Sequence, residues 1–337
     1  MKISIIGAGA IGGLVGTKFS LAGEDVTFIE RPGSHLEAIN KNGLKLVLHD
    51  GEELVARDVK AIVDMDKAGV QDLVVIAVKA YQIPSIAAKM RALLGPSTIV
   101  ITIQNGIPWW YFHKHGGEFE GQRIEAVDPT GEIDANIEPD RIIGCVVYPA
   151  AEVVAPGVIK HVEGNRFPVG ELDGSHSERV EALSQTFTKA GFKSFVLDDI
   201  RSEIWLKAWG NLSFNPISAL TQATLVDICQ FPPTRKLATK MMEEAQTVAN
   251  KLGIQFRHTI EKRIAGAESV GKHKTSMLQD VEAGRELEVE ALVGAVVELG
   301  RLTSTPTPHI DAVYACVKLL DKVMHDARAA IRLKSVA

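Results

Sequence analysis

The sequence has few cysteines, no long apolar run and no excess of positive charge. Its three cysteines, Cys145, Cys229 and Cys316, lie far apart in 337 residues, which argues against a disulfide framework and favours reduced thiols. No apolar run approaches the roughly 18–20 residues that a membrane-spanning helix needs. The net charge of −5 gives no electrostatic reason to expect nucleic acid or an anionic membrane as a partner. We therefore expect a cytoplasmic protein.

Metal-site spacing is also missing. The ten histidines form no ligand pattern, and His113 and His115 lie in the aromatic stretch PWWYFHKHGG, which is more typical of a packed loop. The N-terminal MKISIIGAGA is short for the apolar core of a signal peptide and contains turn glycines. We expect no metal and no cleaved leader.

The sequence does have a regular alternation of apolar runs and helical patterns over residues 1–105. The content of 46% hydrophobic and 23% charged residues is typical of a globular protein, and 337 residues are enough for two domains. Strands alternating with helices predict right-handed βαβ units, and hence an α/β Rossmann-type doubly wound sheet. The predicted strands are KISIIGAG, DVTFIE, QDLVVIAVKA and STIVITIQNG, and the helix IGGLVGTKFSLAG follows the first of them.

A second domain is predicted from a change of pattern near residue 200. Strand-like segments return after residue 141, the last of them FKSFVLDD at 192–199, and later patterns are almost wholly helical. We predict a dinucleotide-binding domain over 1–198 and an all-α substrate and catalytic domain over 199–337. Residues 107–141 are irregular, acidic and aromatic, and we interpret them as an insertion in the first domain.

A glycine motif follows the first predicted strand. Gly7-Ala8-Gly9-Ala10-Ile11-Gly12 fits G-x-G-x-x-G, in which the first glycine permits a tight turn, the second lets backbone approach a pyrophosphate and the third allows close packing. The helix that follows offers N–H groups and its positive dipole end to the phosphates. Its place between a strand and a helix predicts a dinucleotide site.

The preferred dinucleotide depends on two neighbouring residues, Glu30 and Arg31, at the end of the second predicted strand. An acid there binds the ribose hydroxyls of NAD, whereas an arginine can pair with the 2′-phosphate of NADP. A surface ion pair without a cofactor role is the alternative.

A polar seam is expected on the helix EIWLKAWGNLSFNP at 203–216. Lys207, Asn211 and Asn215 recur every four residues, so they share one side of an α-helix that is expected to stop at Pro216. One lysine with two amides is an unusual surface pattern and indicates a lined cleft.

Together these segments resemble the ketopantoate reductase family of pantothenate biosynthesis. The resemblance rests on MKISIIGAGAIGG, VKAYQ at 78–82, QNGI at 104–107, the lysine helix and SMLQD at 276–280, and it covers most of the chain in the right order. It implies a Rossmann domain followed by a helical domain, with NADPH and 2-dehydropantoate held between them. Because Glu30 precedes Arg31, NAD is an open alternative to NADP.

The resemblance also implies the site residues. Lys207 would be the general acid, with Glu288, eight residues after Asp280, as its acidic partner. The implied substrate-binding residues are Asn105, Asn211, Asn215 and Ser276, and the implied cofactor-binding residues are Gly7, Ala8, Gly9, Ala10, Ile11, Gly12, Arg31, Lys79 and Asn105. A lysine suits this chemistry because hydride delivery to a ketone builds negative charge on oxygen, which needs a cation and a proton.

Each implied residue has a structural alternative. Lys207 could be a surface lysine, Asn215 a helix end, and Asn105 with Gly106 a simple turn. Lys79 could merely end a strand, and Glu288 could belong to a solvated acidic face, with Glu290 as a competitor. Ser276 raises a problem of distance, because twelve residues of straight helix would put it about 18 Å from Glu288. One substrate could contact both only if the helix starts late, if it bends, with Gly284 as the place for an irregularity, or if Ser276 acts from the N-terminal cap.

Two other functions are open from the sequence. One is a related NAD(P)-dependent reductase of another 2-oxo acid, and the other is a non-catalytic NADP-binding sensor. The apolar helical patterns after residue 285 suit either a homodimer interface or an ordinary core.

Overall fold

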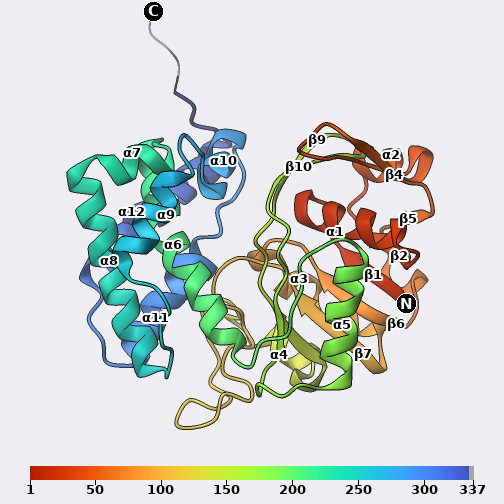
Figure 1. The fold of residues 1–337 in the computed structure, drawn as a ribbon, viewed down its shortest axis with the longest axis horizontal. Helices are drawn as coiled ribbons and strands as arrows, with labels where there is room; N and C mark the ends of the chain where they lie inside the picture. The colour runs from red at the N-terminus through yellow and green to blue at the C-terminus, as the bar shows by residue number, and fades with distance from the viewer. Residues whose placement is uncertain (334–337) are drawn as a thin grey trace, which may run out of the picture. The chain divides into compact units, whose positions relative to one another are not determined.

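The chain forms two compact units, traced in Figure 1. The computed structural model describes residues 1–333. Unit 1 comprises residues 1–104, 108–123 and 130–200, and unit 2 comprises residues 105–107, 124–129 and the chain from 201 onward. Each unit is described by itself below.

Unit 1 is built on a seven-stranded sheet formed within residues 1–333. Its strand order is β11-β8-β7-β6-β1-β2-β5, and all neighbours run parallel except β11, which is antiparallel to β8. The strands are β1 (Lys2–Ile6), β2 (Asp25–Ile29), β5 (Val59–Ile62), β6 (Gln71–Ile76), β7 (Leu94–Thr102), β8 (Ile142–Cys145) and β11 (Val169–Glu171). The order reverses direction at β1, as in a doubly wound fold, so the predicted α/β class is confirmed.

One predicted strand is wrong. Residues 192–199 form only isolated bridges, Lys193 with Arg166 and Val196 with Val169. The segment exchanges backbone hydrogen bonds with residues 165–169, but the carbonyl oxygen of Phe167 accepts the Ser194 hydroxyl at 2.8 Å, where a continuous ladder would place a backbone N–H.

A second, four-stranded sheet was not predicted from the sequence. It has the order β4-β3-β10-β9 and consists of β3 (Leu44–Val47), β4 (Glu53–Ala56), β9 (Ala150–Ala155) and β10 (Val158–Glu163). β3 and β10 pair in parallel, although they lie far apart in the sequence.

Helix α1 (Ala10–Leu21) packs against strands of both sheets (Figure 1). A Cβ at Gly16 would lie 2.3 Å from the Phe28 ring on β2, and one at Gly13 would lie 2.7 Å from Ile159 on β10. Both contacts are closer than real Cβ atoms allow. The glycines of this helix therefore permit its close packing on two sides.

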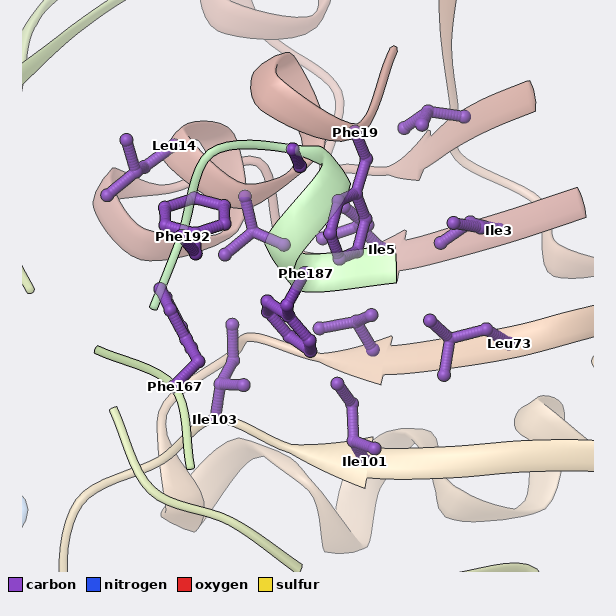
Figure 2. Packing of buried hydrophobic residues seen from close by; sticks show 14 of the residues in the cluster. Ile3, Ile5, Leu14, Phe19, Leu73, Ile101, Ile103, Phe167, Phe187 and Phe192 are labelled. Atoms are coloured by element: carbon purple, nitrogen blue, oxygen red, sulfur yellow. The ribbon is translucent and has the colours of Figure 1, made fainter. Parts of the chain in front are cut away.

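Aromatic rings fill the core of unit 1 beside α1 (Figure 2). Phe187 packs edge-on to Phe19 of α1, with ring centroids 5.0 Å apart, and stacks on Phe167 at 4.9 Å. Ile5 and Leu73 of the parallel strands are fully buried in the same cluster. Such burial on the sheet face explains the nearly continuous apolar runs of the strands.

The remaining elements of unit 1 are short helices. They are α2 (Ser34–Asn42), η1 (Met65–Lys67), η2 (Ala80–Gln82), α3 (Pro84–Met90), η3 (Arg91–Leu93), α4 (Glu132–Asn136), η4 (Pro139–Arg141) and α5 (Glu178–Lys189). The predicted insertion 107–141 lies in the connection between the parallel strands β7 and β8. Its Trp109, Trp110 and Tyr111 are buried, so the segment has its own aromatic packing.

Unit 2 is helical. Its elements are α6 (Ile200–Thr221), α7 (Leu225–Gln230), α8 (Pro232–Lys251), α9 (Ile260–Ser269), α10 (Ser276–Ala283), the π-helical turn η5 (Glu290–Gly294), α11 (Ala295–Leu302) and α12 (Pro308–Ala327). Within residues 1–333, the longer helices are too polar to span a bilayer.

Candidate active site

The glycine motif forms the turn between β1 and α1. Gly7 has φ +98°, and a Cβ there would lie 3.0 Å from the Val78 side chain. A Cβ at Gly12 would lie 2.0 Å from the carbonyl oxygen of Gly7, whereas one at Gly9 would meet no heavy atom of residues 1–333 within 4 Å. Gly7 and Gly12 therefore serve the turn and the packing, and Gly9 leaves an open approach to the backbone. This is the arrangement that a pyrophosphate needs.

The N-terminus of α1 adds the electrostatics of the site. Gly9 is the N-cap residue, and a glycine supplies no side-chain oxygen to cap the first N–H groups. Those groups and the helix dipole favour a bound anion. The turn and the helix start together fit the phosphates of a dinucleotide.

Glu30, directly after β2, is hydrogen-bonded to the glycine turn. Its carboxylate accepts the N–H of Ala8 at 2.7 Å and the N–H of Arg31 at 2.9 Å. The Arg31 residue is exposed. The acid is thus hydrogen-bonded beside the turn, and the neighbouring arginine is exposed.

His35, on α2, also contacts the turn and was missed from the sequence. Its Nδ1 accepts the N–H of Gly157 at 3.1 Å, so the proton of the neutral ring lies on Nε2, which is 2.9 Å from the Ala8 carbonyl oxygen. The ring therefore connects the glycine turn to the turn between β9 and β10. No periodicity could have revealed this contact, since the partner lies 122 residues away.

Lys79 and Gln104 follow the carboxyl ends of β6 and β7. Lys79 is the N-cap residue of η2 and is half-buried, and its N–H donates to Gln82 Oε1 at 3.1 Å. Gln104 Nε2 donates to the carbonyls of Ile76 and Val78 at 2.8 and 3.1 Å. Gln104 thereby fixes the ends of the two strands beside each other, at the edge where doubly wound sheets bind ligands.

The polar seam lies on α6 in unit 2. Lys207 Nζ donates to Asn105 Oδ1 at 2.6 Å, and Asn215 Nδ2 donates to Ser276 Oγ at 3.4 Å. Asn211, between them on the helix, is half-buried, and Asn215 is buried. The structure therefore joins four of the predicted substrate and catalytic residues in two pairs. In the first pair the amide oxygen of Asn105 faces the ammonium, which leaves the amide nitrogen as a donor for another group.

The prediction that the helix stops at Pro216 is wrong. α6 continues to Thr221 with Pro216 inside it. A proline supplies no N–H to the carbonyl four residues earlier, here that of Leu212. The helix is held by its buried side, where Trp209 Nε1 donates to the Met242 carbonyl at 2.8 Å and the Trp209 ring packs on Phe256. Packing overrides the local preference for termination.

The break in the helix between Ser276 and Glu288 is confirmed. α10 starts at Ser276, with Thr275 as its cap, and ends before Gly284, which is left-handed at φ +64°. Glu288 lies beyond this break and is buried, with 5% of its surface exposed. The two residues are therefore not separated by the straight 18 Å helix that the spacing alone would give.

Glu290, the competitor of Glu288, has other partners. Its carboxylate accepts the Tyr314 hydroxyl at 2.9 Å and pairs with Lys318 Nζ at 2.7 Å, both on α12. The hydrogen bond from Lys318 to Glu290 raises the pKa of that lysine, and burial raises the pKa of the Tyr314 hydroxyl. Glu290 therefore connects its turn to α12, which leaves Glu288 as the better candidate for the acidic partner of Lys207.

Comparisons with known proteins identify the family of the chain. Residues 3–174 match the model of ketopantoate reductase PanE/ApbA, and residues 199–321 match the model of its C-terminal domain. The chain is 55% identical to a 2-dehydropantoate 2-reductase of Mesorhizobium japonicum over 95% of this chain and 98% of the relative. It is 31% identical to the enzyme of that name from Archaeoglobus fulgidus, over 89% and 90% of the two chains.

A solved structure from Ralstonia solanacearum MolK2, named as a candidate ketopantoate reductase, has the same fold. It is 37% identical, covers 96% of this chain and 98% of its own, and superposes with a TM-score of 0.91. Both matched domains occur in order along this chain. The chain belongs to the ketopantoate reductase family.

Proposed function

We propose that the chain reduces 2-dehydropantoate to pantoate with NADPH, in pantothenate biosynthesis, and that Lys207 is the general acid. The observation that carries the mechanism is the 2.6 Å hydrogen bond between Lys207 Nζ and Asn105 Oδ1. It fixes an ammonium group on the same helix face as Asn211 and Asn215. The domain ranges 1–198 and 199–337 are proposed as the cofactor-binding and substrate-binding parts.

The proposed role of Lys207 follows from the charge that the reaction creates. When bound, the nicotinamide nucleotide supplies a hydride to the ketone carbon. The π electrons of the C=O bond then move to the oxygen, which becomes an alkoxide. Lys207 stabilises this alkoxide and protonates it to give the alcohol. The neutral lysine regains a proton from solvent. Asn105 orients the ammonium through its amide oxygen without adding a charge that would compete with the alkoxide.

Glu288 is proposed to keep Lys207 protonated and in place. A nearby carboxylate favours the charged form of a lysine, whereas burial alone would lower its pKa. Asn211, Asn215 and Ser276 are proposed to bind the substrate carboxylate and hydroxyl, because amides and a hydroxyl offer both donors and acceptors. The hydrogen bond between Asn215 and Ser276 holds two of these groups together.

The cofactor is proposed to be NADPH rather than NADH. The open backbone at Gly9 suits the pyrophosphate, and the exposed Arg31 can pair with a 2′-phosphate. Lys79 and Asn105 are proposed to contact the nicotinamide half. Glu30 works against NADPH, because its carboxylate would repel a 2′-phosphate nearby and favours the ribose hydroxyls of NADH.

The test is a kinetic assay of NADPH oxidation with 2-dehydropantoate, run in parallel with NADH and with other 2-oxo acids. Saturable turnover that favours 2-dehydropantoate and NADPH supports the proposal. A preference for NADH would reverse only the cofactor assignment. Activity only on a different 2-oxo acid would replace 2-dehydropantoate as the assigned substrate. Nucleotide binding without any turnover would indicate the non-catalytic NADP-binding sensor.

Lys207→Ala is the sharpest variant. We expect kcat to fall by about 10³-fold, since the variant loses both the proton donor and the charge that stabilises the alkoxide. Nucleotide affinity, measured by fluorescence titration, should stay within about twofold, because the glycine turn is unchanged. Wild-type turnover in K207A would refute the general-acid role.

A further inference from the structure

The turn that carries Asn105 is joined to a π-helical turn. Gly106 and Ile107 follow Asn105, and all three belong to unit 2 together with the helices. The N–H of Ile107 donates to the carbonyl oxygen of Ala291 at 2.9 Å. Ala291 is the second residue of η5, and both Ile107 and Ala291 are buried. The backbone beside Asn105 is thereby attached to η5, an element of the same unit that lies far away in the sequence.

The π-helical geometry accounts for the Ala291 acceptor. In an α-helix, Ala295 would give its N–H to the carbonyl of Ala291, four residues earlier. In η5 it gives this N–H to Glu290, five residues earlier. Because the N–H of Ala295 goes to Glu290, the Ala291 carbonyl does not receive it. The Ala291 carbonyl accepts the N–H of Ile107. A π-helical turn inside helical structure often marks a functional position.

Gly106 is the residue that permits this approach. Its φ is +89°, and a Cβ there would lie 2.2 Å from the Ala291 oxygen and 2.5 Å from its carbonyl carbon. These are backbone atoms, so no side-chain rotation could relieve the contact. Gly106 is therefore required for the turn to reach η5, beyond the general preference for glycine at positive φ.

The other side of η5 is anchored as well. Glu290 binds Tyr314 and Lys318 of α12, and a Cβ at Gly294 would lie 2.2 Å from the Glu290 carboxylate oxygen. The π-helical turn is thus fixed by α12 on one side and by Ile107 on the other. Fixed elements position functional groups more accurately than free loops do.

We propose that Gly106 and the π-helical turn are positioning elements for Asn105, and that through Asn105 they set the orientation of the Lys207 ammonium. This inference rests on the proposed function of Lys207. Gly106 and the π-helical turn do not touch the substrate in this mechanism. They act only by fixing the amide oxygen of Asn105 at 2.6 Å from Nζ of Lys207. A displacement of about 1 Å at such a position can cost about 10²-fold in rate.

The test compares Gly106→Ala with Gly253→Ala. Gly253 also lies in unit 2 and has φ +85°, but a Cβ there would meet no heavy atom of the described chain within 4 Å. Both variants carry the backbone strain, and only G106A carries the clash with Ala291. We expect G106A to lower kcat by about 10²-fold and to move the pH profile of kcat, while G253A keeps both. Equal effects of the two variants would overturn the proposal.

A double-variant cycle shows whether Gly106 acts through Asn105. Asn105→Ala should lower kcat by itself, and adding G106A should then cost less than about threefold. Independent, multiplying losses would overturn the positioning role. Should G106A fail to fold, replacement of the Ile107 amide by an ester removes the same hydrogen bond without a new side chain. Its expected loss is about tenfold, and wild-type kcat in the ester variant would overturn the proposal.

Amide hydrogen exchange separates this proposal from the proposed function. Exchange of the Ile107 amide should be slow in the wild type and in G253A, and faster by at least tenfold in G106A, whatever the substrate is. Fast exchange in the wild type would overturn the Ile107 contact even if the enzyme is active. Slow exchange in a protein that does not reduce 2-dehydropantoate would count against the proposed function alone.

Discussion

Two hydrogen bonds decide how Glu30 acts at the glycine turn. By accepting the N–H groups of Ala8 and Arg31, its carboxylate stays at one position and cannot swing into solvent. Each carboxylate oxygen retains a second lone pair that could accept a ribose hydroxyl. A 2′-phosphate would meet a fixed negative charge at this point, next to the guanidinium of Arg31.

Glu30→Gln should therefore shift the cofactor preference toward NADPH. We expect the ratio of kcat/KM for NADPH over NADH to rise about tenfold, or about 1.4 kcal/mol, within the range of a single charge pair near a protein surface. Arg31→Ala is the matched control and should lower the same ratio. An unchanged ratio in E30Q would show that this carboxylate takes no part in cofactor choice.

His176 predicts a pH dependence of stability. Its Nε2 lies 2.7 Å from Asp198 and its Nδ1 lies 3.1 Å from Glu181, and these two carboxylates raise the pKa of the imidazole, Asp198 most. Because the imidazole pKa is higher in the folded than in the unfolded chain, the charged ring stabilises the fold. This stabilisation is complete at pH values below the unfolded pKa of about 6.5, and it is lost as the pH rises through the folded pKa.

The measurement is the melting temperature of the wild type and of His176→Gln between pH 5 and 9. The wild type should exceed the variant at pH 5, and the difference should shrink toward pH 9. A difference that stays constant with pH would mean that the two carboxylates do not stabilise the charged ring.

Single residues differ in how far the sequence could predict them. The roles of Gly7 and Gly12 follow from a local motif, and the four-residue spacing of Lys207, Asn211 and Asn215 follows from the helix period. The bond between His35 and Ala8 does not, because it depends on the hairpin that carries Gly157. Long-range contacts of this kind leave no local periodicity.

At the scale of elements, α1 shows how packing fixes the choice of residue. Its glycines contact Phe28 on one side and Ile159 on the other, so the helix is held between two sheets. Glycine normally weakens a helix interior by about 1 kcal/mol relative to alanine. Here the close approach of the sheets outweighs that cost.

Gly16→Ala should destabilise the protein by about 1–3 kcal/mol, because its Cβ would overlap the Phe28 ring. Gly266→Ala on α9 is the matched control, since its Cβ would meet no heavy atom of residues 1–333 within 4 Å. That change should stabilise the protein by about 0.5–1 kcal/mol. Denaturant midpoints measure both, and shifts of the same sign would contradict the packing argument.

Two further elements show where sequence patterns fail. A proline usually ends a helix, yet α6 continues beyond Pro216, and its Trp209 is hydrogen-bonded to Met242 of α8. The π-helical turn η5 looks like ordinary helix in the sequence, because its geometry depends on the Ile107 contact far away in the chain. Tertiary packing decides both cases.

At the scale of the whole molecule, the alternation of strands and helices was enough to predict the parallel sheet and the helical second unit. It was not enough to predict the four-stranded sheet. β3 and β4 have four residues each, which is too short for a clear pattern, and β3 pairs with a strand that lies far away in the sequence.

The parallel pairing of β3 with β10 has a consequence for synthesis. Lys45 pairs with Val158, so one edge of β3 lacks its partner until about 110 more residues have been translated. At about 5–20 residues per second this takes about 6–22 s, during which an unpaired strand edge is exposed to other chains. Nascent chains arrested before Val158 should therefore be cut by protease within residues 44–56, and chains that have released Glu163 should be protected. Equal cleavage of the arrested and the released chains would mean that β3 finds a partner earlier. Protection of the released chains alone would mean that the rate of translation, rather than the finished fold, sets how long this protein is most prone to aggregate.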